Sequence, residues 1–255
     1  MTRVIKVGGR PQADVRLPEA IAAAHRCEPG SLLIVHGGGD ETSTLQRTYG
    51  VEPRFRGGRR VTGQLDLDII RMSLSGAANK RLVASLVARG VPALGLSGED
   101  AALLTATPID IEEYGFVGTP AEINVGLLMH LMTGGYLPVL SPVSRCSDAA
   151  VGLTLNVNGD DAAAAIAVAV EASELLLVSD VAGVLVNDEP LGTIGPEDAH
   201  RLIADGVAKG GMSAKLQAAL VALEGGVERV RISDIAAIED LDRGTVLTRA
   251  GSVCT

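Results

Sequence analysis

The stretch Val4-Ile5-Lys6-Val7-Gly8-Gly9 is a short apolar run that one lysine interrupts and two glycines end. A run of this length and composition predicts a buried β-strand. Glycines at a strand end leave backbone N–H groups accessible, and such groups bind phosphate oxygens. An unpaired charge in a buried strand is costly, so the position of Lys6 favours a functional lysine over a solvated one.

Parts of this arrangement recur further along the chain. The apolar run Leu32–Val35 leads through His36 into the triple glycine 37–39, and Lys215 follows Gly210-Gly211 near the start of a predicted helix. A cation near a helix N-terminus is unfavourable unless an anion lies close by, which is a hint of phosphate. Two lysines that converge on one phosphoryl group would neutralise the charge that its transfer must spread. The pattern indicates a nucleotide-dependent kinase; His36 receives no role.

Short apolar runs alternate with helical patterns along the chain, which predicts a mainly parallel sheet covered by helices on both faces. Strands are expected at Val4–Val7, Leu32–Val35, Pro92–Leu96, Leu137–Leu140, Leu175–Val178 and Val230–Ser233. Helices are expected at Pro18–Cys27, Asp40–Tyr49, Leu65–Arg89, Pro120–Gly134, Asp160–Ala172, Pro196–Gly206, Met212–Gly225 and Ile235–Leu241. We predict a three-layer α/β/α sandwich of two lobes, residues 1–172 for the amino-acid substrate and the phosphoryl site and residues 173–255 for the nucleotide.

Composition excludes several functional classes. The chain of 255 residues carries a formal net charge of −9, which argues against nucleic-acid or anionic-membrane binding. Its three cysteines are far apart, so we expect reduced, mostly buried thiols and no zinc or disulfide framework. No signal peptide or membrane-spanning run is apparent, and we expect a soluble, cytoplasmic protein. The usual mononucleotide and dinucleotide fingerprints are absent.

Two polar segments are candidates for a site. Asn156-Val157-Asn158-Gly159-Asp160 precedes an alanine-rich helix, where Asn158 or Asp160 suits a helix cap, and capping is compatible with catalysis. A basic loop in the otherwise acidic chain contains Arg54, Arg56, Arg59 and Arg60. A solvated charged loop is the favoured interpretation for three of these four arginines.

Taken together, these segments resemble the amino acid kinase family, and within it most closely the acetylglutamate kinases, over nearly the whole chain. The matching segments are Ile5–Gly9, His36–Gly39, Arg60–Thr62, Gly76–Lys80, Gly134–Val139, Asn156–Asp160, Ser179–Leu185 and Gly211–Lys215. The resemblance implies ATP-dependent phosphorylation of the γ-carboxylate of N-acetyl-L-glutamate to an acyl phosphate, a step of arginine biosynthesis. A carboxylate is already an anionic nucleophile, so catalysis needs positioning and charge stabilisation rather than a base.

The resemblance also implies roles for individual residues. Lys6 and Lys215 would stabilise the transferring phosphoryl group and the leaving ADP, and Asp160 would orient both lysines. Arg60 would pair with the substrate α-carboxylate through its planar fork. The amino-acid pocket would be completed by Gly38, Gly39, Asn156 and Asn158. The nucleotide would lie near Lys6, Gly8, Gly9, Ser179, Asp180, Gly183, Leu185, Gly211, Met212 and Lys215, with Mg²⁺ held on the ATP phosphates and no protein metal ligand.

Some segments leave the substrate open. Gly159 stands where the family pattern has alanine, and the segments 95–100 and 225–230 also resemble kinases that act on glutamate or aminoadipate linked to a small acidic carrier protein. The arginines at 54, 56 and 59 would meet such a carrier. A non-catalytic amino-acid sensor of the same fold is a third hypothesis, against which the retention of both lysines and Asp160 speaks. Because the first strand is expected by Val4, we expect arginine insensitivity and a homodimer.

Overall fold

The structure is a computed structural model that describes residues 1–148, 150–151 and 153–249; the predicted thiol of Cys254 lies outside them. The strands are β1 (Arg3–Val7), β2 (Leu32–His36), β3 (Phe55–Arg56), β4 (Arg59–Arg60), β5 (Ala93–Gly98), β6 (Leu104–Pro108), β7 (Val117–Ile123), β8 (Leu137–Cys146), β9 (Thr154–Val157), β10 (Glu174–Val178), β11 (Leu185–Val186), β12 (Glu189–Pro190), β13 (Thr193–Ile194), β14 (Arg229–Ser233) and β15 (Thr245–Leu247). The helices are α1 (Gly9–Gln12), α2 (Leu17–Cys27), α3 (Gly39–Thr48), α4 (Gln64–Ile70), η1 (Arg71–Ala78), α5 (Asn79–Val87), η2 (Asp100–Ala102), α6 (Ile111–Tyr114), α7 (Val125–Thr133), α8 (Gly159–Ala169), α9 (Pro196–Ala204), α10 (Gly211–Glu224) and η3 (Ile235–Ile238).

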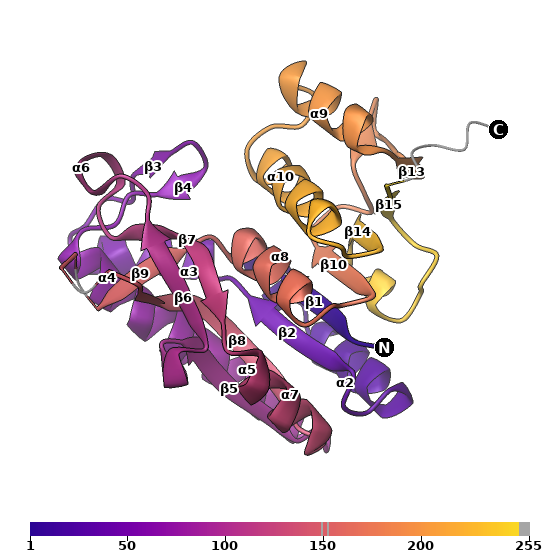
Figure 1. The fold of residues 1–255 in the computed structure, drawn as a ribbon, viewed down its shortest axis with the longest axis horizontal. Coiled ribbons are helices and arrows are strands. Elements are labelled where there is room, and N and C mark those ends of the chain that lie inside the picture. Colours follow the sequence, from indigo (N-terminus) through magenta and orange to yellow (C-terminus); the bar gives the residue numbers. More distant parts are fainter. Residues whose placement is uncertain (149, 152, 250–255) are drawn as a thin grey trace.

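One 11-stranded sheet runs through the described residues in the order β13-β15-β14-β10-β1-β2-β8-β6-β7-β9, with β5 also paired to β8. The central strands β14, β10, β1, β2 and β8 are parallel, as predicted. Figure 1 shows α9, α10 and β13 to β15 at one end of the molecule, and α4, α6 and the β3–β4 hairpin at the other. Because β1 and β2 stand in the middle of the strand order, their carboxyl ends lie at the centre of the sheet's width.

The side chains of β1 alternate between two hydrophobic layers, as the pleat of a strand requires. Val4 belongs to the layer that contains the buried side chains of α8 and α10. Ile5 and Val7 belong to the opposite layer, with side chains of α2, α5 and η3. Helices cover both faces, which confirms the three-layer α/β/α sandwich. Lys6 shares its face with Val4 and so points toward α8 and α10.

The predicted helix at Pro120–Gly134 is wrong in its first part. Residues 117–123 form β7, which pairs antiparallel with β6 and parallel with β9. The helix α7 begins only after Asn124, whose side chain accepts a hydrogen bond from the Leu127 N–H at 3.1 Å. Pairing of β7 with β6 and with β9 overrides local helix preference, and this antiparallel end of the sheet was not predicted.

The long helix predicted at Leu65–Arg89 is present, but its middle is the π-helix η1 between α4 and α5. A π-helix has more residues per turn than an α-helix and occurs mostly at functional sites. Here Ile70 and Leu74 line a cavity at the carboxyl end of the sheet. The continuous helix formed by α4, η1 and α5 thus directs side chains both into that cavity and into the hydrophobic core.

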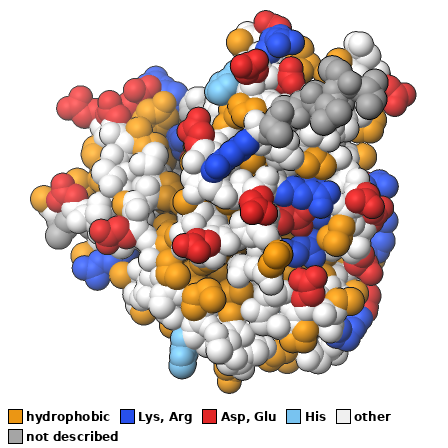
Figure 2. Space-filling view, turned by 45° about the vertical axis from the view of Figure 1, so that its right-hand side comes forward, with side chains coloured by type: hydrophobic (Ala, Val, Ile, Leu, Met, Phe, Trp, Pro, Cys, Tyr) orange, Lys and Arg blue, Asp and Glu red, His pale blue; other side chains and the backbone are white. Residues whose placement is uncertain are grey.

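The surface mixes charges of both signs. Figure 2 shows acidic and basic side chains interspersed over one face of the molecule. Cys27 is exposed and Cys146 is buried, so the expectation of mostly buried thiols holds for only one of the two described cysteines. None of the described helices combines the length and the apolar character that a bilayer crossing requires.

Candidate active site

Lys6, Asp160 and Lys215 form a charged cluster at the carboxyl end of β1. Lys6 Nζ lies 2.8 Å from Asp160 Oδ1, and Lys215 Nζ lies 3.2 Å from both oxygens of the same carboxylate. All three side chains are buried. Two cations share one anion, so the cluster retains an excess positive charge in a weakly solvated place. Such a site binds an additional anion.

The pKa values of the cluster follow from burial and from the neighbouring charges. Burial alone would raise the pKa of Asp160, but the two ammonium groups outweigh it and hold that pKa below its ordinary value. Burial lowers the pKa of Lys215, as does the charge of Lys6, while Asp160 opposes both effects. Asp160 is therefore held as a carboxylate. Lys215 shares its only described carboxylate partner with Lys6, and a bound phosphoryl group would supply further negative charge beside it.

Two glycine turns, the first at Gly8-Gly9 and the second at residues 37–39, pack backbone against backbone beside this cluster. A Cβ on Gly9 would stand 3.2 Å from the Gly39 amide nitrogen, and a Cβ on Gly37 would stand 3.9 Å from Lys6 Nζ. A side chain at Gly9 would therefore press on the Gly39 backbone, and one at Gly37 would extend beside the lysine. The amide of Gly8 already donates to the Val178 carbonyl at 3.3 Å, so its predicted bond to phosphate would compete with that partner.

His36 supports the second glycine turn, residues 37–39, through hydrogen bonds of its ring. Its Nε2 lies 3.0 Å from the donor Nδ2 of Asn79, and its Nδ1 lies 3.0 Å from the Gly37 carbonyl oxygen. Nε2 must accept and Nδ1 must donate, which fixes a neutral ring in one tautomer. Burial lowers the pKa of His36 to about 4. The residue is structural and positions the Gly37 carbonyl.

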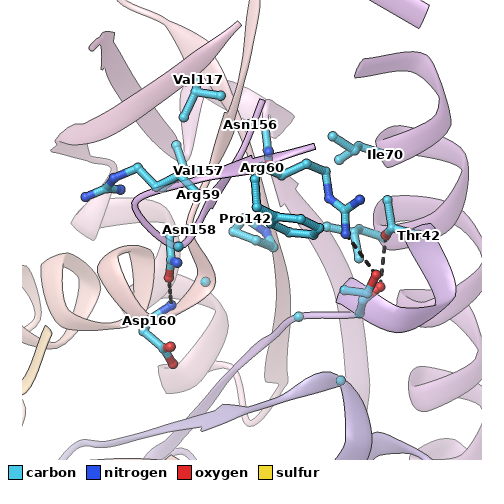
Figure 3. Close-up of a pocket in the computed structure, with 18 of the residues that line it drawn as sticks. Thr42, Arg59, Arg60, Ile70, Val117, Pro142, Asn156, Val157, Asn158 and Asp160 are labelled. Carbon is cyan, nitrogen blue, oxygen red and sulfur yellow. Dashed lines mark hydrogen bonds between the residues drawn. The ribbon is translucent and has the colours of Figure 1, made fainter. Parts of the chain in front are cut away.

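A first cavity of about 200 Å³ opens between the β3–β4 hairpin and the glycine turns. Of the predicted residues, it is lined by Lys6, Gly9, Gly38, Gly39, Arg60, Asn156, Asn158 and Asp160. Figure 3 shows Asn158 bonded to the backbone of Asp160, where it caps α8 as expected. Asn156 donates to Thr62 Oγ1 at 3.1 Å. The cavity is also lined by residues of segments that the sequence singled out, namely Gly37, Arg59, Val157 and Gly159. The residues that sequence reasoning missed are Thr42, Phe55, Gly58, Ile70, Leu74, Val117 and Pro142.

Arg60 is held in place before any substrate arrives. Its guanidinium donates to the Gly39 carbonyl and to Ser43 Oγ, each at 2.9 Å, and to Gln46 Oε1. The ring of Phe55 lies 4.6 Å from the guanidinium carbon, within the range of a cation–π contact. Burial lowers the pKa of Arg60, although the nearby Asp66 opposes this. A buried, oriented guanidinium is suited to receive a carboxylate.

A second cavity of about 450 Å³ lies on the other side of the lysines. It is lined by Gly8, Gly9, Arg10, Pro11, Val178, Ser179, Asp180, Val181, Gly211, Met212 and Lys215. Gly9 lines both cavities, which therefore meet beside the charged cluster. Three of the residues predicted for the nucleotide are not among the described residues that line this cavity: Lys6, which lines the first cavity, Gly183 and Leu185. Gly183 instead packs against Thr245.

Within the described residues, no group of three or more His, Cys, Asp or Glu side chains is arranged to hold a metal ion. Asp180, at the mouth of the second cavity, is engaged by Arg10 at 2.9 Å.

Comparison with known proteins agrees with this arrangement. The model of the amino acid kinase family matches residues 1–234. The chain is 41% identical over 254 residues to the acetylglutamate kinase of Methanopyrus kandleri, covering 96% of this chain and 99% of the relative. It is 40% identical over 239 residues to that of Chloroflexus aurantiacus, with 93% of each chain covered.

Solved structures show the same fold. The structure of smu.665 from Streptococcus mutans UA159 superposes with a TM-score of 0.88 at 29% identity, covering 97% of this chain and 98% of that chain. Carbamate kinase from Giardia lamblia bound to citric acid superposes with a TM-score of 0.72 at 16% identity and with similar coverage, 97% and 98%. The lysine cluster, the glycine turns and these matches lead to one conclusion: the chain belongs to the amino acid kinase family.

Proposed function

We propose that this protein transfers the γ-phosphoryl group of ATP to the γ-carboxylate of N-acetyl-L-glutamate, forming an acyl phosphate in arginine biosynthesis. The observation that carries the proposal is the buried cluster in which Asp160 holds Lys6 at 2.8 Å and Lys215 at 3.2 Å. The relatives named acetylglutamate kinase support the substrate, because they are 38–41% identical to this chain over 89–99% of its length.

The mechanism assigns one cavity to each substrate. The acylated amino acid enters the first cavity, with its α-carboxylate on Arg60 and its γ-carboxylate directed at Lys6. ATP enters the second cavity, with its phosphates directed at Lys215 and Gly9. The carboxylate oxygen attacks phosphorus, the bond to the bridging oxygen breaks, and ADP leaves with that electron pair. Each lysine faces one side of the transferring group, whose spread charge they stabilise.

The acidic residue between the lysines has a positioning role in this proposal. Asp160 keeps the two ammonium groups close enough to act on one phosphoryl group. Mg²⁺ would be held through the ATP phosphates and would neutralise part of their charge. The division into an N-terminal lobe, residues 1–172, and a nucleotide-binding C-terminal lobe, residues 173–255, is part of the same proposal.

The contacts of the basic hairpin favour a free substrate over a carrier-linked one. Arg56 pairs with Glu113 at 2.5 Å, and Arg59 pairs with Asp161 at 2.6 Å. Two of the three arginines that would meet an acidic carrier protein are thus engaged by carboxylates of this chain. A carrier would have to displace Glu113 and Asp161 from these arginines, which lowers the binding free energy that its negative charge could contribute.

A hydroxamate assay tests the proposed substrate. The purified protein, ATP and Mg²⁺ are incubated with N-acetylglutamate, N-succinylglutamate, glutamate or aminoadipate, and hydroxylamine traps the acyl phosphate. We expect product with N-acetylglutamate at the highest kcat/KM. Product only from carrier-linked glutamate or aminoadipate would replace the substrate, and ATP binding without any product would indicate a sensor.

A homodimer and a cytoplasmic location complete the proposal. Sedimentation velocity tests the assembly, for which we expect a single dimeric species. A monomer or a hexamer would contradict it.

A further inference from the structure

Arg59 and Asp161 form an ion pair that joins two elements of the first cavity. Arg59 Nη1 lies 2.6 Å from Asp161 Oδ2, and the two side chains are only 28% and 22% exposed. Arg59 lies on β4 beside Arg60, while Asp161 follows Asp160 in the first turn of α8. Figure 3 shows Arg59 and Arg60 leaving β4 in opposite directions. The pair therefore ties the strand that carries the predicted substrate arginine to the turn that carries the lysine-holding carboxylate.

Apart from Arg59 and from Arg60, whose guanidinium bonds to Gly39, Ser43 and Gln46, the β3–β4 hairpin is weakly held. Its strands are two residues long, and Gly57 and Gly58 between them have φ of 53° and 76°, as a tight hairpin turn requires. Phe55 is 59% exposed. The hairpin's other ion pair joins Arg56 and Glu113, whose side chains are 57% and 38% exposed. A pair so exposed to water contributes little, so the half-buried Arg59–Asp161 pair is the stronger tether.

We propose that the Arg59–Asp161 ion pair is a positioning device that holds the β3–β4 hairpin over the first cavity and so keeps Arg60 in place for the substrate α-carboxylate. The inference rests on the proposed function for the identity of that substrate. Arg59 and Asp161 are positioning residues, because neither contacts the reacting groups.

A direct role for Arg59 as a substrate ligand is less consistent with these contacts. Its guanidinium is already paired with a carboxylate, so the pair offers a dicarboxylate substrate no excess charge. Arg60, by contrast, forms no ion pair with a carboxylate of the described residues. Its guanidinium donates hydrogen bonds to neutral oxygens. Arg59 thus holds the hairpin, and Arg60 receives the substrate.

Two matched variants test the proposal. Asp161→Asn removes the carboxylate that holds Arg59, and Glu113→Gln removes the one that holds Arg56 on the same hairpin. We expect Asp161→Asn to raise KM for N-acetylglutamate about tenfold, because the lost tether lets Arg60 move, with kcat and KM for ATP changed less than about twofold. Glu113→Gln is expected to leave all three values within about twofold.

The conservative variant and the opposite result sharpen the test. Asp161→Glu keeps the charge and is expected to recover most of the affinity that Asp161→Asn loses. If Arg59 instead binds the substrate itself, Asp161→Asn would leave KM unchanged or lower it, since it frees the guanidinium. That result, or a loss confined to kcat, would overturn the proposal.

Limited trypsin digestion of the ligand-free protein supplies a readout that does not depend on activity. Both variants retain every arginine of the hairpin, so the cleavage sites after Arg54, Arg56, Arg59 and Arg60 are the same. We expect cleavage between residues 54 and 61 to be several-fold faster in Asp161→Asn than in Glu113→Gln or the unchanged protein. Equal cleavage rates would refute the tether. Absence of product from N-acetylglutamate in the unchanged protein would refute the proposed function instead.

Discussion

At the scale of single residues, the site depends on three charges and on the glycines around them. Asp160 is nearly excluded from solvent, yet the lysines keep its pKa low, so it stays a carboxylate that holds them together. The sequence predicted this set because each member lies beside a local signal, a glycine turn or a helix start. It did not predict the partners of Arg60, namely Gly39, Ser43 and Gln46, because they depend on how α3 packs against β4.

Lys215 is expected to act mainly in the transition state. Lys215→Met should lower kcat by a factor that corresponds to about 2–4 kcal/mol, with a much smaller change in ATP affinity. Steady-state kinetics with a separate ATP-binding titration measures both effects. Lys209→Met, which alters an exposed lysine just before the same helix, serves as the control. Near-normal turnover of Lys215→Met would exclude the proposed role.

Gly159 departs from the alanine of the family pattern, and the structure says what an alanine would meet there. A Cβ at this position would stand 3.2 Å from Lys6 Cε, which lies in a flexible side chain. We expect Gly159→Ala to change kcat by less than about threefold and to raise the free energy of unfolding by about 0.4–1 kcal/mol, because alanine restricts the unfolded chain. Urea unfolding and kinetics measure this; a large loss of kcat would show that Lys6 has no room to adjust.

At the scale of elements, strand pairing and helix packing decide what local patterns leave open. The parallel strands were predictable because each is a continuous apolar run, as in β10 and β2. β7 was not, because its sequence alternates too little and its partner β9 lies far along the chain. His36 belongs to this scale as well, since it links the end of β2 to Asn79 at the start of α5.

The buried neutral state of His36 makes stability depend on pH. Its pKa falls from an ordinary 6.5 to about 4 in the folded protein, so below pH 6.5 the unfolded chain binds a proton that the folded chain does not. Stability is therefore lost as pH falls from 6.5 toward 4, by roughly 1.4 kcal/mol per pH unit.

A variant isolates this contribution from that of other groups. Between pH 7 and pH 5, we expect His36→Gln to lose about 2 kcal/mol less stability than the unchanged protein. Urea unfolding at the two pH values measures the difference. The buried His25, whose pKa is also lowered by burial, remains in both proteins and cancels. Equal losses in the two proteins would show that His36 is protonated in the folded state.

At the scale of the whole molecule, one buried ion cluster ties the C-terminal strands to β1. Glu174 on β10 lies 2.9 Å from Arg3 and 2.6 Å from Arg231, whose side chain is fully buried. Arg231 also donates to the carbonyls of residues 237, 240 and 243, which fixes the segment after η3. Burial would raise the pKa of Glu174, but its bonds to Arg231 and Arg3 outweigh this and lower it.

Breaking this cluster should destabilise the whole fold. Glu174→Gln removes the anion and leaves the charge of Arg231 buried, for which we expect a loss of about 3–5 kcal/mol in the free energy of unfolding. Glu19→Gln, which breaks exposed pairs with Arg26 and Arg89, should cost less than about 1 kcal/mol. Chemical denaturation of the two variants measures the contrast, and similar losses would contradict it.

The sequence by itself determined the candidates for the chemistry: Lys6, Asp160 and Lys215 each lie near a glycine at the end of a regular element, and the resemblance to the amino acid kinases implied their joint role. Only the tertiary structure decided what surrounds that chemistry. The bond between Arg59 and Asp161 spans 102 residues, and Arg231 meets Glu174 across 57. Such contacts depend on strand order and helix packing, and no local pattern of residues encodes them.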